Sequence, residues 1–183
     1  MSVIKKIKEK LGEAKLKGAA VKSPRKKKFV NIAEAKTIGI IFDATSIDHL
    51  EILKKYVASL KEKKKIVKAV GFFDQKFTPV NISYSKAEFD FFNLKELTGL
   101  QQPSSPYIGT FINEPHDVLL DLNIQNKFPL RSIAIQSMAR FKIGINIPEN
   151  KEIHDLFLSL KPEEGLVKFL EQAEKYLDMI DKG

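Results

Sequence analysis

Acidic and polar residues follow several of the buried strands that the sequence predicts. Asp43, Asp74 and Asp121 stand at or near the ends of continuous apolar runs, and Thr45 and Asn123 come two positions after two of them. In an open parallel sheet, ligands bind beyond the carboxyl ends of the strands, near the point where the strand order reverses. Carboxylates gathered there can hold Mg²⁺ or act as acid and base. Together these residues form a possible ligand rim.

The same residues also have a plainer interpretation, which we favour. Asp and Asn at strand ends commonly cap the next helix or begin a turn. Spacing along the chain does not place carboxylates from different strands side by side. The sequence therefore assigns no catalytic residue, no metal site and no cofactor.

Other motifs that would indicate an enzyme are missing. There is no G-x-G-x-x-G and no G-x-x-x-x-G-K-[ST], so dinucleotide or P-loop chemistry is not expected. The histidines His49, His116 and His154 have no metal-ligand spacing, and we expect His49 and His116 to be exposed or partly packed. No G-x-S-x-G elbow exists. The absence of cysteine excludes disulfides, thiolate catalysis and cysteine-ligated metals.

The net positive charge lies in a basic N-terminal arm, residues 1–36. This segment holds 12 of the 31 Lys and Arg residues and 3 of the 23 Asp and Glu residues, a net charge of +9, whereas the remainder has a net charge of −1. Charge asymmetry of this kind favours a polyanionic partner. The arm is therefore the main functional candidate in the sequence.

The arm has two parts with different predicted conformations. Val3, Ile4, Ile7, Leu11 and Ala14 fall within one apolar arc, which predicts an amphipathic helix over residues 3–17 that needs a surface to dock on. After Pro24, the four like charges of residues 25–28 should be extended and mobile unless an anion holds them. The cations expected to contact nucleic-acid phosphates are Lys5, Lys6, Lys8, Lys10, Lys15, Lys17, Lys22, Arg25, Lys26, Lys27 and Lys28.

Three interpretations of the arm remain open. It is a solubilising leader, it binds the phosphates of RNA, with the ribosome a natural partner, or it binds an anionic membrane surface. The membrane is less favoured because the apolar arc has no Trp or Phe anchor. No apolar run is long enough to span a bilayer and no secretory signal is present, so we expect a cytoplasmic location.

Residues 37–183 show the alternation of an α/β domain. Runs of apolar residues predict strands, and helical spacing predicts the elements between them. The predicted strands are 37–43, 65–73, 117–122, 141–147 and an edge strand at 155–160, with short strand-like pieces at 80–84 and 89–92. A capping box at Thr45 to Asp48 begins the first predicted helix. Further helices are predicted at 107–113, 130–140 and 163–180, and Asn93 is predicted to cap a brief turn. We predict a single Rossmann-like domain with a doubly wound, three-layer and mostly parallel sheet.

Two resemblances accompany this pattern. Residues 117–122 with 139–144 resemble part of the N-terminal Rossmann-like domain of heptosyltransferase-type glycosyltransferases, but the Gly-Asp loop after the first strand of those enzymes is absent. The segments 39–45, 71–73 and 111–130 are similar to an uncharacterised bacterial family of single-domain proteins. The first resemblance implies a fold and the second implies no activity.

Our preferred hypothesis is a non-enzymatic protein whose basic arm docks the α/β body onto RNA, with the ribosome as the expected partner. A rival hypothesis from another class is a small enzyme or ligand-binding domain that uses the acidic rim. A third is an adaptor that binds another protein through the irregular segment 75–115. The sequence leaves the oligomeric state open.

Overall fold

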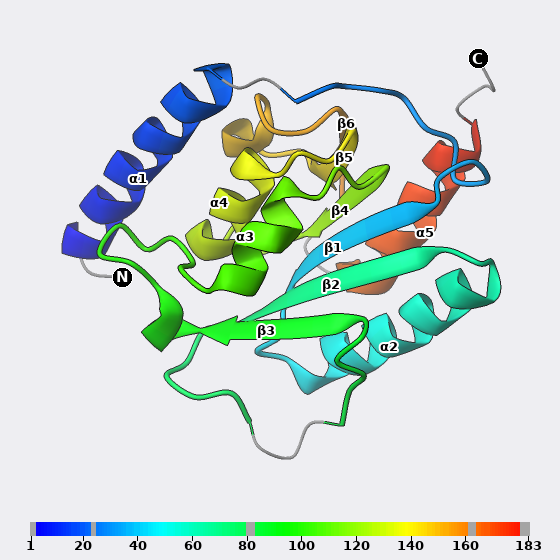
Figure 1. Ribbon diagram of the computed structural model, residues 1–183, viewed down its shortest axis with the longest axis horizontal. Helices are drawn as coiled ribbons and strands as arrows, with labels where there is room; N and C mark the ends of the chain where they lie inside the picture. Colours follow the sequence, from blue (N-terminus) through cyan, green and yellow to red (C-terminus); the bar gives the residue numbers. More distant parts are fainter. Residues whose placement is uncertain (1–2, 23–24, 80–82, 161–163, 180–183) are drawn as a thin grey trace.

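The structure is a computed structural model that describes residues 3–22, 25–79, 83–160 and 164–179, with the backbone alone described for 19–22. A six-stranded sheet with the order β3-β2-β1-β4-β5-β6 forms the centre of the molecule, and every neighbouring pair is parallel (Figure 1). The strands are β1 (Thr37–Asp43), β2 (Ile66–Phe73), β3 (Phe89–Asn93), β4 (Val118–Leu122), β5 (Phe141–Ile145) and β6 (Leu156–Leu158). The predicted parallel α/β fold is confirmed, with β6 at one edge.

Helices cover both faces of this sheet. The helices α2 (Ile47–Glu62) and α5 (Gly165–Met179) pack on one face, while α3 (Pro106–Asn113) and α4 (Phe128–Gln136) pack on the other. Alternate strand residues enter the two cores: Ile40 and Leu120 face α2 and α5, whereas Ile41 and Leu119 face α3 and α4. Because both faces are covered, the central strands are mostly apolar.

Some element boundaries differ from those predicted. Ser46, rather than Thr45, is the N-cap of α2 and accepts a hydrogen bond from the His49 N–H. Helix α4 ends at Gln136 because Ser137 already has an extended ψ of 134°. Residues 83–84 are not a strand, and residues 80–82 lie outside the described chain. The predicted Asn93 cap is confirmed, and a short 3₁₀ turn, η1 (Leu94–Glu96), follows it.

His116 is buried, which corrects the prediction that it is exposed or partly packed. It has a relative exposure of 1%, and its ring lies on Gly39 of β1. A Cβ atom at Gly39 would lie 2.7 Å from His116 Cδ2, so only glycine leaves room for the ring. Burial lowers the pKa of His116 and so favours the neutral imidazole.

The N-terminal residues pack against the body. Helix α1 (Val3–Lys22) extends beyond the predicted 3–17 and lies outside α4 (Figure 1). We call residues 25–36 the strap, because they cross the amino ends of β5 and β6 on the way from α1 to β1. Val30 and Ile32 of the strap are buried in the core on the α5 side of the sheet. The predicted basic arm is therefore not separate from the body: its described residues pack on it.

Candidate functional site

Helix α1 is held against the body by a close approach at Gly12. A Cβ atom at this position would lie 2.9 Å from the Leu100 carbonyl oxygen and 3.0 Å from the Phe128 ring. Leu16, one turn further along, is 6% exposed and joins the core beneath α4. The seat of α1 is thus the face that carries Gly12 and Leu16.

An ion pair fixes how α1 is rotated on this seat. Glu13 Oε2 lies 2.8 Å from Arg131 Nη2, and both side chains are largely buried. Arg131 also donates to Asn126 Oδ1 at 2.6 Å. At about 100° per residue, Gly12, Leu16 and Glu13 fall within one arc of the helix, so the ion pair and the close approach select the same side of α1.

The apolar arc of α1 faces away from the body. Val3, Ile4, Ile7 and Leu11 have relative exposures of 73%, 65%, 53% and 59%. Helical geometry of about 100° per residue places this arc opposite the seat at Gly12 and Leu16. We call Val3, Ile4, Ile7 and Leu11 the outer stripe. Within the described chain, no helix is both long and apolar enough to cross a membrane.

Lysines flank the outer stripe on both sides. Helical spacing places Lys8 and Lys15 along one side and Lys6 and Lys10 along the other. These four are exposed and enter no ion pair with a described carboxylate. Lys5 lies half-buried near the seat, and the side chain of the predicted contact Lys22 is outside the described residues.

Not every predicted cation is free. Lys17 lies 3.2 Å from Glu13 Oε1 and 3.0 Å from Glu152 Oε2. Lys27 lies 3.2 Å from Asp155 Oδ1. These pairs lower the number of charges that the N-terminal segment presents to a partner.

Arg25 is the main anchor of the strap. Its Nη2 lies 2.5 Å from Asp155 Oδ2, and its Nη1 donates to the carbonyls of Ala139 and Arg140. Both side chains are less than a tenth exposed. The sequence predicts that the run at 25–28 is mobile unless an anion holds it. Asp155 is such an anion within the protein. Lys26 and Lys28 remain exposed on the strap.

A buried lysine lies next to this anchor. Lys142 Nζ donates to the Ala134 carbonyl at 2.6 Å, and its backbone N–H donates to Asp155 Oδ2. Burial, reinforced by the positive charge of Arg25, lowers the pKa of Lys142 to about 7. The amino ends of β5 and β6 therefore carry a titratable group inside the fold.

At the carboxyl ends of β1 and β2, three residues of the predicted ligand rim lie around Lys127. The Lys127 ammonium lies 2.7 Å from Asp43 Oδ2, 3.4 Å from Asp74 Oδ2 and 3.4 Å from Thr45 Oγ1. Burial would raise the pKa of Asp43, but hydrogen bonds from Lys127 and Thr45 outweigh it and hold the pKa below its ordinary value. This cluster lies where the strand order reverses between β1 and β4.

Asp121 and Asn123 serve the same cluster indirectly. Asn123 brackets the backbone of Lys127, accepting from its N–H and donating to its carbonyl, each at 2.8 Å. Asp121 Oδ1 accepts from the Asn123 N–H, while its Oδ2 lies 2.9 Å from His154 Nε2. The His154 ring in turn covers Gly144 of β5. Asp121 therefore supports the loop and does not join Asp43 and Asp74.

Sequence reasoning missed Lys127, the residue on which the rim converges. Its only local signal is its place four residues after Asn123, in the loop between β4 and α4. The described residues contain no cluster of three or more metal-ligating side chains. The three N–H donors of Lys127 match its three oxygen neighbours, so the cluster is internally satisfied.

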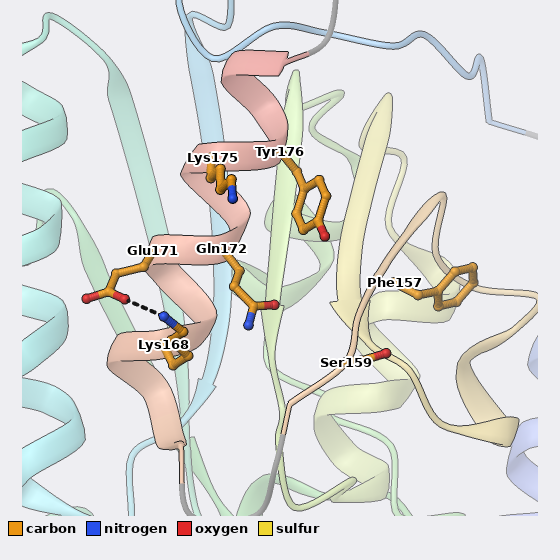
Figure 2. Close-up of a pocket in the computed structure, with 7 residues that line it drawn as sticks. All are labelled: Phe157, Ser159, Lys168, Glu171, Gln172, Lys175 and Tyr176. Atoms are coloured by element: carbon orange, nitrogen blue, oxygen red, sulfur yellow. Dashed lines mark hydrogen bonds and ion pairs between the residues drawn. The ribbon is translucent and has the colours of Figure 1, made fainter.

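A separate groove of about 490 Å³ lies between α5 and β6 (Figure 2). Most of its lining comes from α5, and Phe157 and Ser159 come from β6 and the residue after it. Lys168 and Glu171 pair with each other at 3.2 Å on its rim. The lining residues are Phe157, Ser159, Lys168, Glu171, Gln172, Lys175 and Tyr176, none of which belongs to the predicted rim.

The strand order makes this an all-parallel, doubly wound α/β protein, and a cationic helix, α1, packs on the outside of α4. The chain belongs to the family of unknown function DUF6913, whose model matches residues 8–180. The match includes most of α1 and the whole strap, as well as the α/β body. No curated protein and no solved structure matches the chain significantly, so the heptosyltransferase resemblance gains no support.

Proposed function

We propose that this protein is a docking protein, in which the outer surface of α1 holds the α/β body on a phosphate-bearing polyanion. The observation that carries the proposal is the exposed state of Lys6, Lys8, Lys10 and Lys15, which pair with no described carboxylate. Some lysines of the body are instead paired, as Lys61 is with Glu88. Unpaired ammonium groups can replace the counterions that surround a polyanion.

The strap extends this cationic surface. Lys26 and Lys28 are exposed immediately beyond α1, and Arg25 fixes the segment that carries them to Asp155. A rigid display of charge loses less conformational entropy on binding than a mobile tail does. RNA, including the ribosome, and phospholipid headgroups both offer the phosphate oxygens that such a surface attracts.

The strand-end rim supports a ligand-binding function less well. Asp43 and Asp74 already face the Lys127 ammonium. A ligand that used either carboxylate would have to displace this lysine from a largely buried position. The outer surface of α1 needs no such rearrangement.

Charge reversal on α1 tests the proposal. The variant Lys8→Glu/Lys15→Glu alters one flank of α1, and the control Lys55→Glu/Lys175→Glu makes the same change in net charge on exposed residues of α2 and α5. Association is measured by sedimentation with ribosomal particles and by flotation with vesicles containing an anionic phospholipid, each at low and high salt.

We expect the unaltered protein to bind one of these probes at low salt and to be released at high salt. The α1 variant should bind at least about tenfold more weakly, because it replaces attraction by repulsion at two contacts. The control should bind like the unaltered protein. Absence of binding to both probes at low salt, or an equal loss in the two variants, contradicts the proposal.

A further inference from the structure

We infer that the polyanion is an anionic lipid bilayer, and that α1 lies in its headgroup layer with the outer stripe turned toward the acyl chains. The inference rests on the proposed function, because it uses the same surface of α1, and it names the partner of that surface. It adds a requirement for apolar contact that a purely electrostatic partner does not have.

The first step is the orientation of α1. A surface helix normally turns its apolar face toward the core of its own protein. Here Gly12, Glu13 and Leu16 hold the opposite face on the body, and Val3, Ile4, Ile7 and Leu11 remain more than half exposed. A contiguous apolar patch framed by polar residues marks an interaction surface.

The second step is the arrangement of charge around this patch. Lys8 and Lys15 border the outer stripe on one side, and Lys6 and Lys10 border it on the other. A helix that lies in a membrane interface has this cross-section, with apolar residues facing the acyl chains and lysines reaching the headgroups at both flanks. Anionic lipids supply the countercharge.

The third step compares other occupants of the stripe. A second copy of this chain would bring its own lysine rows against those of the first, which is unfavourable between like charges. RNA would satisfy the lysines but leave the stripe in water, since proteins bind bases by stacking aromatic side chains and α1 contains none. A bilayer satisfies the charges and the apolar residues together.

The position of the body also suits a bilayer. The seat at Gly12 and Leu16 lies on the side of α1 opposite the outer stripe, so the body stands behind the helix. Figure 1 shows α1 at the margin of the molecule, with α4 on its inner side. Docking therefore needs no unfolding of the helix from the body.

A single introduced fluorophore tests the insertion directly. The chain contains no tryptophan, so Leu11→Trp places the only indole on the outer stripe. Ile47→Trp is a matched control, because Ile47 is also exposed, at 66%, but belongs to α2. We expect the emission of Leu11→Trp to shift to shorter wavelength with vesicles of phosphatidylcholine and phosphatidylglycerol, and that of Ile47→Trp to stay unchanged.

A binding experiment separates this inference from the proposed function. Flotation compares the unaltered protein with Ile7→Gln/Leu11→Gln and with Ile47→Gln, using vesicles of phosphatidylcholine alone or with phosphatidylglycerol, and ribosomal particles as the second probe. Both aliphatic side chains would be buried in the bilayer, so replacing them should weaken binding to the anionic vesicles by about tenfold or more. Ile47→Gln should bind like the unaltered protein, and neutral vesicles should bind weakly. Equal thermal unfolding of the three proteins shows that the fold is retained.

The remaining outcomes are distinct. Binding to ribosomal particles without binding to anionic vesicles overturns the lipid inference and leaves the proposed function standing. Vesicle binding that Ile7→Gln/Leu11→Gln does not weaken, or a Leu11→Trp emission that does not move, also overturns it, because docking is then electrostatic only. Failure to bind either probe overturns both.

Discussion

Glu13 of α1 and Arg131 of α4 form an ion pair of 2.8 Å across 118 positions of the chain. This pair helps to determine which side of α1 faces the body. The apolar arc of the same helix is consequently left on the outside. Together with the close approach at Gly12 and the burial of Leu16, this pair decides which surface of α1 is exposed.

Removing the charge of Glu13 should loosen α1. We expect Glu13→Gln to lower the free energy of unfolding by about 3 kcal/mol, because it leaves the largely buried Arg131 guanidinium without its anion. Hydrogen exchange should show faster exchange in α1. Glu9→Gln is the control, since Glu9 has no ion pair with described residues and should change neither quantity. Unchanged exchange in α1 of Glu13→Gln would falsify this role.

Two glycines of α1 should respond in opposite directions to alanine. A Cβ atom at Gly12 meets the Leu100 carbonyl and the Phe128 ring, whereas nothing lies within 4 Å of a Cβ at Gly18. We expect Gly18→Ala to raise stability by about 0.5–1 kcal/mol through helix propensity. Gly12→Ala should lower it by about 1–3 kcal/mol through overpacking. Chemical denaturation measures both, and an equal gain at the two positions contradicts the seat described for α1.

The strap should depend on Arg25. We expect Arg25→Met to lower the free energy of unfolding by about 3–5 kcal/mol, because Asp155 is then a buried carboxylate whose remaining ion pair among the described residues is with the exposed Lys27. The double variant Arg25→Met/Asp155→Leu should regain part of this loss. Lys26→Met, next to Arg25 but exposed, serves as the control. Urea denaturation of the four proteins gives the comparison, and a loss no larger than that of Lys26→Met counts against the anchor.

Lys142 should make stability rise with pH above neutrality. Its pKa is about 7 in the folded protein and 10.5 in the unfolded chain. Between these values the unfolded chain binds one more proton, so the free energy of unfolding rises with pH by at most about 1.4 kcal/mol per unit. Denaturation between pH 7 and 9.5 should show this slope in the unaltered protein and a flatter curve for Lys142→Met. The same slope in both proteins would exclude Lys142 as its source.

Lys127 should control the titration of Asp43. The Lys127 ammonium helps to hold the pKa of Asp43 below its ordinary value, against the effect of burial. In Lys127→Met the burial and the hydrogen bonds from Thr45 remain and the cation is gone, so the pKa of Asp43 should rise. Lys127→Arg keeps the charge and should keep the pKa low. Carboxyl ¹³C NMR titration measures this pKa in each protein, and equal values in Lys127→Met and Lys127→Arg would contradict the ion pair.

Much of the fold could be predicted because its signals are local. The apolar run at 37–43 coincides with β1, and the spacing of Leu166, Phe169, Leu170, Ala173 and Leu177 gives the buried face of α5. Asn93 caps its turn as its type and position indicate. Strands and helices have fixed periods, so a few neighbouring residues are enough to specify each element.

Only part of the ligand rim could be predicted from the positions of its residues along the chain. Asp43, Thr45 and Asp74 were candidates from their positions after strands, and they do lie together. Asp121 was a candidate on the same ground, yet its carboxylate faces His154. The side chain that gathers the others, Lys127, follows from the path of a loop that no periodicity describes.

The sequence by itself determined the α/β alternation, the helix at the N-terminus and the concentration of positive charge in the first 36 residues. Only the tertiary structure decided which face of α1 points outward and that Asp155 holds Arg25. The physical reason is that periodicity reports a helix and its apolar side, whereas its seat depends on contacts with residues about 90 to 120 positions away. At Gly12 and Arg131 those contacts outweighed the burial of four aliphatic side chains, and α1 kept its apolar face in solvent.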